Sequence, residues 1–513
     1  MGLYCIIGRG FGNGAEVMSE EFGLKRVIGL GGLVAIEVGT TVGAGVFSLT
    51  ALAARRTGPA VPLAFVAAAI PIVFIMMTVG MLGSMLPTAG GTYRYPSRLF
   101  SPLWATVGVW CYALGLVFGA FPMYATECVH YLQAVWPHIP LKPAAIGLLT
   151  LFYLVNVFGV SLATQVQALM VLVLVAALLV FGISGVPHID PQNFDPLMAG
   201  GAGGFLVAAC ILTFALQGSN SVIELGAEIK DPVKNIPRSL LISIPAVTVL
   251  YVLVSLSAVG TVDMDAWMSY GDKANLTQPA KAFMCEDSAV LSGPGLPPSE
   301  EKAVPADSAG AGVPLSGLFI FFLVGGAMFA FTTTLNGTFM WATKSLLVIA
   351  NDGIMPKRLA RTSRFGTPAL FLTIIWALAV AAVLADAGIE IFAAYATIGG
   401  MIIFIPSMIA AMLLPKKLPR VYHAPGYRLK GFMLYVAPAI GIVTSALLIV
   451  ILLVDLLSMH WVYPALFLVW SAMGFVFHWS RKKTLEKSTG EDLEKMFARD
   501  LEDMARRAEN NEY

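Results

Sequence analysis

The chain has 513 residues, of which 57% are hydrophobic and 12% are charged, whereas an ordinary soluble domain has about 25% charged residues. Its formal net charge is only +1, and no basic patch suggests a nucleic-acid partner. The charges lie in short clusters between apolar stretches, and stretch after stretch reaches the roughly 20 residues with which a helix crosses a bilayer. These features exclude a water-soluble protein and predict an all-α integral membrane protein surrounded by lipid.

Residues 1–25 are polar and rich in glycine, and we predict that they form an N-terminal tail. The run Gly8-Arg9-Gly10-Phe11-Gly12 follows no strand and opens no helix, so it is not interpreted as a dinucleotide-binding loop. Neither a cofactor nor a metal site is expected.

Twelve transmembrane helices are predicted, because lipid offers no hydrogen-bond partner to backbone groups. They lie at about residues 27–54, 60–86, 103–128, 143–160, 162–186, 203–226, 239–262, 315–349, 367–386, 389–414, 431–457 and 461–480. The membrane domain therefore occupies residues 26–480, and its last two helices occupy about 431–480. Residues 481–513 are dense in charge and predict a C-terminal helix with a thin apolar stripe that includes Leu493, Met496, Leu501 and Met504.

The distribution of lysine and arginine predicts the orientation, since cytoplasmic loops carry an excess of both. The chain has 32 lysines and arginines. The termini and the loops on their side of the membrane hold 25 of them, the loops on the opposite side hold 6, and Lys344 lies inside the eighth span. Both termini are therefore expected in the cytoplasm of a multi-pass protein of the cell membrane. The loop 263–314 is then external and irregular, and a disulfide between Cys128 and Cys285 on that side is an open alternative.

The first span contains three glycines and two threonines between Gly39 and Gly45, which weaken the helix at its deepest point. Small residues there are compatible with close helix packing. They are also compatible with a discontinuous helix that opens at Gly43-Ala44-Gly45. Its second half would then begin with free N–H groups near the midplane, which form a carboxylate site without a cationic side chain.

The sixth span favours the discontinuous helix, because it carries Gln217-Gly218-Ser219-Asn220-Ser221 halfway along an apolar segment. Transporters built from inverted repeats place broken helices at corresponding positions of their two halves, with the substrate between them. Spans one and six correspond in two five-span halves, at about 27–186 and 203–414. The spacing thus predicts a 5+5 inverted repeat with broken helices 1 and 6, plus two additional helices. Carbonyl groups of Thr41, Phe214 and Gln217 would receive an ammonium group.

Four motifs, in order over about residues 25–480, resemble those of the amino acid–polyamine–organocation permeases, which have the leucine-transporter fold. They are Gly43-Ala44-Gly45-Val46-Phe47, Pro87-Thr88-Ala89-Gly90-Gly91-Thr92-Tyr93-Arg94-Tyr95, Glu228-Ile229-Lys230-Asp231-Pro232 with Asn235-Ile236-Pro237, and Asn351-Asp352-Gly353-Ile354-Met355-Pro356. The resemblance implies that the N–H groups of Ala44 and Gly45 bind a substrate carboxylate and that Phe214 closes over the substrate. It also implies that Asn220 contacts the substrate side chain.

The sequence departs from the family pattern in span five, where Leu174 occupies the position at which many proton-coupled members have a lysine. Glu37, one helical turn before Thr41, is the candidate replacement, because a carboxylate at that depth must be paired, protonated or functional. A structural pair between Glu37 and Lys344 is the alternative. Glu224 is interpreted as a gate or loop contact. Thr332 and Thr333 are candidate sodium ligands, although adjacent threonines also hydrogen-bond between helices.

These features predict a secondary active transporter of amino acids, with a neutral amino acid as substrate and protons as the coupling ion. Sodium-coupled or exchange transport, polyamines as substrates and a sensor that binds an amino acid without transport are the alternatives. No arrangement of a nucleophile and a histidine indicates an enzyme.

Overall fold

The computed structural model describes residue 26 and residues 28–133, 136–158, 160–271, 274–284, 317–361, 363, 367–385 and 387–509. The N-terminal tail and Cys285 lie outside these residues, as do the side chains of Ala44 and Asn220. The described part of the chain is helical and has no β-strand, only isolated backbone bridges from Ile28 to Ile229 and from Ala89 to Leu225.

The first half of the chain contains α2 (Leu30–Thr41), α3 (Ala44–Thr57), α4 (Val61–Met85), α5 (Gly91–Leu99), α6 (Pro102–Gly115), α7 (Phe121–Gln133), α8 (Leu141–Val157), α9 (Val160–Gly185), α10 (Gly201–Phe214) and α11 (Ser221–Glu224). The second half contains α12 (Pro232–Gly260), α13 (Met264–Met268), α14 (Thr277–Met284), α15 (Gly317–Phe321), α16 (Phe329–Asn351), α17 (Ala369–Ala385), α18 (Ile389–Lys417), α19 (Pro419–His423), α20 (Met433–Met459), α21 (Val462–Thr489) and α22 (Leu493–Glu509). Two wider π-helical turns, Leu116–Ala120 and Phe322–Met328, join α6 to α7 and α15 to α16.

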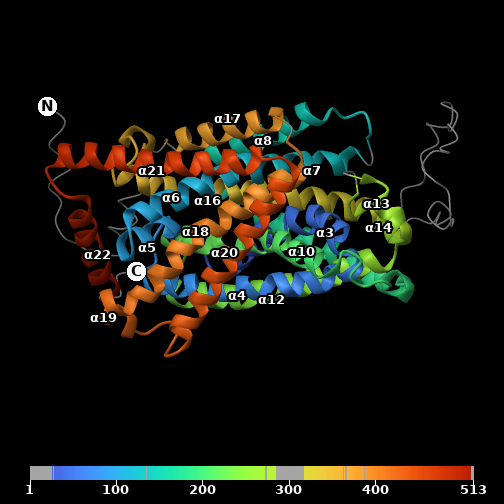
Figure 1. Cartoon of the computed structure of the whole chain (residues 1–513), viewed down its shortest axis with the longest axis horizontal. Coiled ribbons are helices and arrows are strands. Elements are labelled where there is room, and N and C mark those ends of the chain that lie inside the picture. Colours follow the sequence, from blue (N-terminus) through green and yellow to red (C-terminus); the bar gives the residue numbers. More distant parts are fainter. Residues whose placement is uncertain are drawn as a thin grey trace.

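Nine segments of the described residues are long and apolar enough to cross a membrane, and α8 and α17 are shorter apolar helices. The first segment, Leu30–Met85, has 56 residues and comprises α2, α3 and α4. The long helices run side by side along the longest axis of the molecule (Figure 1). This arrangement confirms an all-helical membrane protein.

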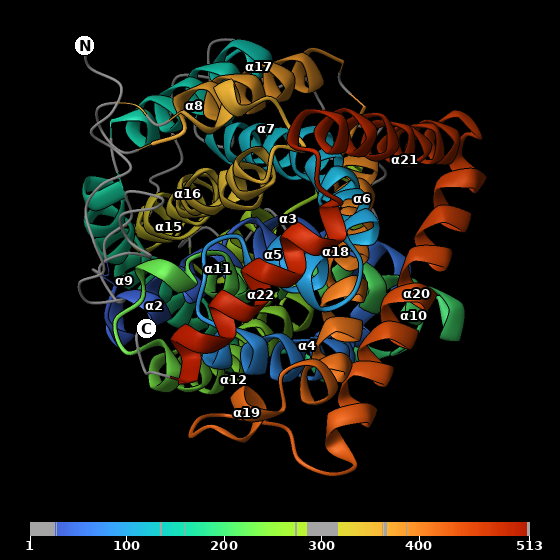
Figure 2. The ribbon, with the colours of Figure 1, turned by 90° about the vertical axis from the view of Figure 1, so that its left-hand side faces the viewer.

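The two ends of the bundle differ. Helices α5, α19 and α22 lie at one end, which we call the α22 end, and α13 and α14 lie at the other, the α14 end (Figure 1). Viewed from the α22 end, α22 crosses in front of α5 and α11 (Figure 2). The C-terminal region is not the single helix predicted for residues 481–513, because α21 continues to Thr489 and Gly490 then adopts the left-handed conformation (φ 71°) before α22 begins.

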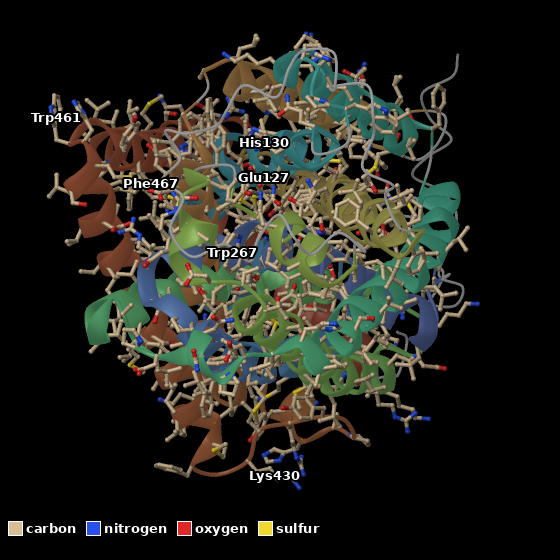
Figure 3. The ribbon with its side chains drawn as sticks, turned by 90° about the vertical axis from the view of Figure 1, so that its right-hand side faces the viewer. Glu127, His130, Trp267, Lys430, Trp461 and Phe467 are labelled. Carbon is tan, nitrogen blue, oxygen red and sulfur yellow. The ribbon has the colours of Figure 1, made fainter. Side chains whose placement is uncertain are left out.

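The segment between α12 and α15 is more ordered near α12 than the predicted irregular loop, since it forms α13 and α14. Trp267 of α13 is 1% exposed, and its indole N–H donates to the carbonyl of Asn275 at 3.0 Å (Figure 3). The Tyr131 hydroxyl donates to the Phe47 carbonyl at 2.8 Å and accepts the Leu276 N–H at 3.1 Å. This segment is thereby attached to α3 and α7.

Candidate functional site

The first span is interrupted at Val42 and Gly43. Helix α2 ends at Thr41, and α3 begins at Ala44 without a side-chain cap on its first N–H groups. Gly43 has ψ −122°, which is incompatible with a continuing helix. The break therefore overlaps the predicted run at Gly43 and begins one residue earlier, and it leaves the N-terminus of α3 in the protein interior.

The sixth span is interrupted over a longer distance. Helix α10 ends at Phe214, a 3-10 turn covers Gln217–Asn220, and the single turn of α11 ends at Glu224. Glycine is a weak helix former, and serine and asparagine bond to nearby backbone groups instead of continuing a helix. The polar run at the centre of this span thus interrupts the helix as the sequence predicts.

Glycines bring the two interrupted helices into backbone contact. A Cβ atom on Gly218 would overlap the backbone of Thr40 and Thr41, and the carbonyl oxygen of Thr40 would lie only 2.6 Å from it. A Cβ atom on Gly45 would lie 2.6 Å from the Cα of Ala215. The Thr40 hydroxyl lies 2.9 Å from the carbonyl of Gly218. Close packing and helix interruption, which the sequence presents as alternatives, therefore occur together.

Tyr251 of α12 links the two interruptions, and the sequence analysis did not identify it. Its hydroxyl contacts the carbonyl of Thr41 and lies 3.1 Å from the carbonyl of Ala215. Thr41 is one of the residues whose carbonyls were expected to receive an ammonium group, and here that carbonyl already accepts the tyrosine. Tyr251 is fully buried and packs against Phe65 at 5.0 Å between ring centroids. An aromatic residue in the middle of an apolar helix gives no distinguishing signal in a single sequence.

A small cavity of about 30 Å³ lies beside the interruptions. It is lined by Thr40, Tyr112, Leu116, Ala120, Tyr124, Phe214, Gln217, Gly218, Thr338, Trp341 and Ala396. A volume of this size holds about two water molecules. Three of the lining residues, Phe214, Gln217 and Gly218, are predicted site residues. Gly43 and Gly45 are not among the lining residues.

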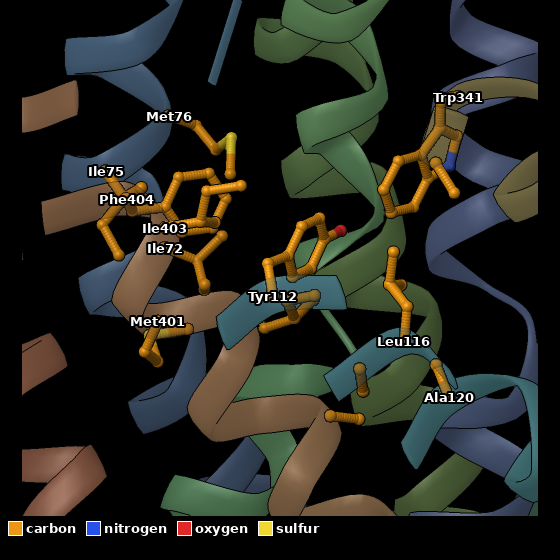
Figure 4. Close-up of a cluster of buried hydrophobic side chains, with 14 of the residues drawn as sticks. Ile72, Ile75, Met76, Tyr112, Leu116, Ala120, Trp341, Met401, Ile403 and Phe404 are labelled. Atoms are coloured by element: carbon orange, nitrogen blue, oxygen red, sulfur yellow. The ribbon is translucent and has the colours of Figure 1, made fainter. Parts of the chain in front are cut away.

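Aromatic side chains lie on both sides of this cavity. Tyr124 stacks on Phe214 with 6.3 Å between ring centroids, and Tyr112 stacks on Trp341 at 5.7 Å. Tyr112, Leu116 and Trp341 also line a second cavity of about 20 Å³, which reaches Glu224, and Figure 4 shows these three side chains. The Nε1 of Trp341 and the Nε2 of Gln217 are buried and have no hydrogen-bond partner among the described residues. Two donors are thus left for an acceptor on a bound molecule.

The Glu37 side chain is buried and receives two serine hydroxyls from α12. Ser239 donates to it at 2.7 Å, and Ser243 donates to its second oxygen. A Glu37–Lys344 pair is therefore wrong: the amino group of Lys344 lies 2.5 Å from the carboxylate of Glu228, in the third motif. The sequence has three carboxylates at or just after the end of span six, on Glu224, Glu228 and Asp231. Only the fold shows that Glu228 contacts Lys344.

Glu224 connects three elements at the end of the sixth span. Its carboxylate accepts the N–H of Thr92 at 3.2 Å and the Ser345 hydroxyl at 2.9 Å, and it also contacts the Thr92 hydroxyl. Thr92 belongs to the second motif, and the preceding Gly90 adopts the left-handed conformation (φ 64°). Glu224 therefore joins α5 to α16, and its interpretation as a gate or loop contact stays a prediction.

The three threonines of α16 all bond to carbonyls of their own helix, and the sodium site stays a prediction. The hydroxyls of Thr332 and Thr333 bond to carbonyls of their own helix, at 2.7 Å to Met328 and 2.9 Å to Ala330. The hydroxyl of the next residue, Thr334, bonds to the carbonyl of Ala330 at 2.9 Å and also lies 3.4 Å from the carbonyl of Gly39 in the first span. A Cβ atom on Gly43 would overlap the same hydroxyl. Which of the three hydroxyls faces the interruption of the first span depends on how α16 is rotated about its axis. The sequence of three adjacent threonines does not determine that rotation.

The second and fourth motifs meet α22 at the α22 end. Arg98 forms a bidentate pair with Asp352, with two N–O distances of 2.7 Å, and its Nε lies 2.8 Å from Asp500 of α22. Arg94 lies 3.0 Å from the same Asp500. The ring of Phe497 lies 3.9 Å from the Arg98 guanidinium. We call these five side chains the α5–α22 cluster.

A family model described as amino acid permease matches residues 32–480. The branched-chain amino acid permease BcaP of Bacillus subtilis (strain 168) is 25% identical over 491 residues, covering 90% of this chain and 95% of the relative. The methylthioribose transporter of the same organism is 25% identical over 495 residues, covering 92% and 96%. BcaP of Lactococcus lactis subsp. cremoris (strain MG1363) is 25% identical over 379 residues, covering 69% and 74%. The chain therefore belongs to the amino acid permease family, whose members are multi-pass membrane transporters and not enzymes.

Proposed function

We propose that this protein is a secondary active transporter that carries a neutral amino acid across the cell membrane by alternating access. The observation that carries the proposal is the contact between the two interrupted helices beside a small cavity, at the places where a 5+5 repeat would position its substrate. We further propose twelve transmembrane helices in residues 26–480, with repeats at about 27–186 and 203–414, an external loop at 263–314, and cytoplasmic tails at 1–25 and 481–513.

In this proposal the substrate carboxylate binds the N-terminus of α3, at the N–H groups of Ala44 and Gly45, as anions do at helix N-termini. Gly43 permits the close approach, and the α-amino group lies among the carbonyls of Thr41, Phe214 and Gln217. Asn220 and the aromatic side chains around the cavity contact the substrate side chain. A cavity lining without charged side chains and a relative named for branched-chain amino acids support a neutral substrate.

The cavity is too small for any amino acid, so the substrate enters only after the helices separate. Tyr251 competes for the Thr41 carbonyl that the ammonium group requires. We therefore infer that Tyr251 occupies this carbonyl in the empty protein and releases it when substrate binds.

Purified protein in liposomes provides the test of transport. A thermal-shift screen against the twenty amino acids and several polyamines identifies ligands, because binding raises apparent stability by mass action. Counterflow of a radiolabelled hit then separates transport from sensing: a transporter accumulates the label, and a sensor binds it without flux. Amides of the hit, which lack the carboxylate, should fail to compete. Competition by the amide at the same concentration would contradict the carboxylate site.

We expect Tyr251→Phe to lower the KM of uptake about tenfold while the protein still folds, because the substrate then has no tyrosine hydroxyl to displace from the Thr41 carbonyl. The variant keeps the packing against Phe65 but removes the hydroxyl that lies between Thr41 and Ala215, and a lost hydrogen bond in a buried site costs about 1–3 kcal/mol. The measurement is initial uptake over a range of substrate concentrations. Tyr153→Phe is the control, since the Tyr153 hydroxyl bonds to that of Thr373 on α17 and contacts neither interruption among the described residues. Equal uptake by both variants would show that the Tyr251 hydroxyl plays no part.

We propose protons as the coupling ion and Glu37 as their carrier. Glu37 lies on α2, one turn before the interruption, and its hydrogen-bond partners are two hydroxyls, which can serve either the charged or the neutral carboxyl. Movement of α2 away from α12 would expose the carboxyl to water and change its proton affinity. Lys344 is separately paired with Glu228 and therefore does not neutralise Glu37 directly.

We expect Glu37→Gln to remove most of the pH dependence of uptake, because glutamine keeps the contacts with both serines but carries no titratable proton. The measurement is uptake between pH 5 and 8 with and without a proton gradient. Glu228→Gln is the comparison variant, with a buried carboxylate outside the proposed proton path. A pH profile of Glu37→Gln identical to the wild type would assign Glu37 a structural role. Sodium-dependent uptake in the wild type would instead favour a sodium site near Thr332, Thr333 and Thr334.

A further inference from the structure

A groove on the flank of the bundle is much larger than the cavities of the interior. Its volume is about 390 Å³, and it lies between α4, α12 and the residue Tyr427 that follows α19. It is lined by Val73, Met76, Met77, Pro237, Arg238, Leu240, Leu241, Ile244, Pro245 and Tyr427. Leu241 is 76% exposed and Val73 is 38% exposed, so the groove opens to the outside of the bundle.

The surroundings of the groove indicate a hydrocarbon occupant. Both helices that form it are among the segments apolar and long enough to cross a membrane. All but one of its lining side chains are apolar or aromatic. Water in such a groove would meet hardly any hydrogen-bond partner. Each methylene group transferred from water into an apolar site contributes about 0.8 kcal/mol, so a lipid chain fills the groove more favourably than water does.

Arg238 supplies the charge that selects among lipids. It is exposed at the α22 end of the groove and forms neither an ion pair nor a hydrogen bond with any described residue. Exposed Lys430 lies at the edge of the molecule (Figure 3), three residues after the groove residue Tyr427. A guanidinium binds phosphate through two parallel hydrogen bonds. The groove therefore matches an anionic head group above an apolar chain.

Two prolines explain why α12 leaves room here. Pro237 and Pro245 lie inside the helix and cannot donate to the carbonyls four residues earlier. The carbonyl of Val233, freed by Pro237, accepts the hydroxyl of Ser84 at 2.9 Å, which holds α12 to α4 at this end. The segment between the prolines is thus a weakened stretch of helix whose outer face lines the groove.

The buried face of the same segment holds the carboxylate of Glu37. Ser239 and Ser243, which donate to Glu37, alternate with the groove residues Arg238, Leu240 and Ile244. We propose that the groove is a binding site for an anionic phospholipid, whose phosphate binds Arg238 and whose acyl chain lies against α4 and α12. A lipid in this position braces the stretch of α12 that positions Glu37.

The test measures lipid binding directly and does not depend on transport. Full-length protein is incubated with equal amounts of phosphatidylglycerol and phosphatidylcholine, and native mass spectrometry counts the lipids that remain bound after detergent exchange. We expect wild-type protein to retain phosphatidylglycerol preferentially and Arg238→Gln to reduce that retention about fivefold, since one arginine near an anionic lipid contributes about 1 kcal/mol. Lys234→Gln, on the same helix but outside the groove, should retain the wild-type level.

A second pair of variants tests the apolar part of the site. Val73→Phe fills the groove and should displace the acyl chain, whereas Val66→Phe adds the same ring at a 46% exposed position of α4 outside the groove. Reduced retention in Val73→Phe but not in Val66→Phe supports the site. Equal phosphatidylglycerol retention by Arg238→Gln and Lys234→Gln, or equal retention of the two lipids by the wild type, would overturn the proposal.

Discussion

Replacement of Gly218 by alanine is expected to abolish uptake. The added methyl group would overlap the backbone of α2 at Thr40 and Thr41, where no side chain can move aside. The two interrupted helices would have to separate at the point where the Thr40 hydroxyl meets the Gly218 carbonyl. Overpacking of this kind costs about 1–3 kcal/mol, and here the displaced groups belong to the proposed substrate site itself. Uptake in liposomes and the apparent melting temperature in detergent are the two measurements.

Gly203→Ala is the matched control for Gly218→Ala. Gly203 lies in α10 of the same span, and a Cβ atom there would meet nothing within 4 Å. Alanine also favours a helix by about 1 kcal/mol over glycine. The control should therefore transport at the wild-type rate with unchanged or higher stability. Normal uptake by Gly218→Ala would show that the contact seen here is absent from every state of the transport cycle.

A Gly45→Leu variant would place a bulky side chain beside the proposed carboxylate site and would change two features at once. Its side chain would collide with Ala215 of α10, so a loss of uptake reports the helix contact as well as the carboxylate site. Competition by substrate amides addresses the carboxylate alone. The two experiments together separate the packing role of Gly45 from the binding role of its N–H group.

The helix interruptions could be predicted from the sequence because they follow from local chemistry. Gly43 and Gly218 weaken a helix wherever it lies, and the polar run after Leu216 has alternatives to helical hydrogen bonds. The membrane spans follow from length and hydropathy for the same reason. The start of α12 was less predictable, because the helix begins at Pro232, seven residues before the predicted span. Proline is favoured in the first turn of a helix. This first turn is polar, so it lies outside the apolar stretch from which the span was predicted.

Side-chain partners could not be predicted, because they depend on helix rotation and on contacts between distant segments. Lys344 pairs with Glu228 and not with Glu37, the one partner proposed for it from the sequence. All three threonines of α16 bond to their own helix, and Thr334 also reaches the first span. Tyr251 resembles any other aromatic residue in a membrane helix until its hydroxyl is seen between two interrupted helices.

The α5–α22 cluster gives a further case of distant partners, and Arg98→Met is expected to destabilise the protein by about 3–5 kcal/mol. The Arg98 side chain is 3% exposed and that of Asp352 is 12% exposed, so methionine would leave a buried carboxylate without its bidentate partner. It would also remove the guanidinium that contacts Asp500 and the Phe497 ring. The change should appear as a lower melting temperature in detergent and as faster proteolysis between α21 and α22.

Arg499→Met is the control, because Arg499 is on α22 but is 61% exposed and pairs with an exposed Glu491. A surface pair of this kind contributes little, and the variant should stay within about 0.5 kcal/mol of the wild type. Equal stability of the two variants would mean that α22 is held by its apolar face, which buries Leu493, Phe497 and Leu501, without help from the cluster.

The charge of Asp500 also gives the cluster a pH dependence with a defined sign. Burial raises the pKa of the Asp500 carboxyl, but Arg94 and Arg98 lower it, and the resulting pKa lies below its usual value. A carboxyl whose pKa is lowered by folding stabilises the folded protein at pH values above its unfolded-state pKa of about 3.9. That stabilisation is lost as the pH falls through the lower, folded-state pKa. Attachment of α22 should therefore be constant between pH 5 and 8, the range in which Glu37 is tested. A pH effect on uptake that persists in Asp500→Asn but disappears in Glu37→Gln would then originate at the first span and not at the α22 end.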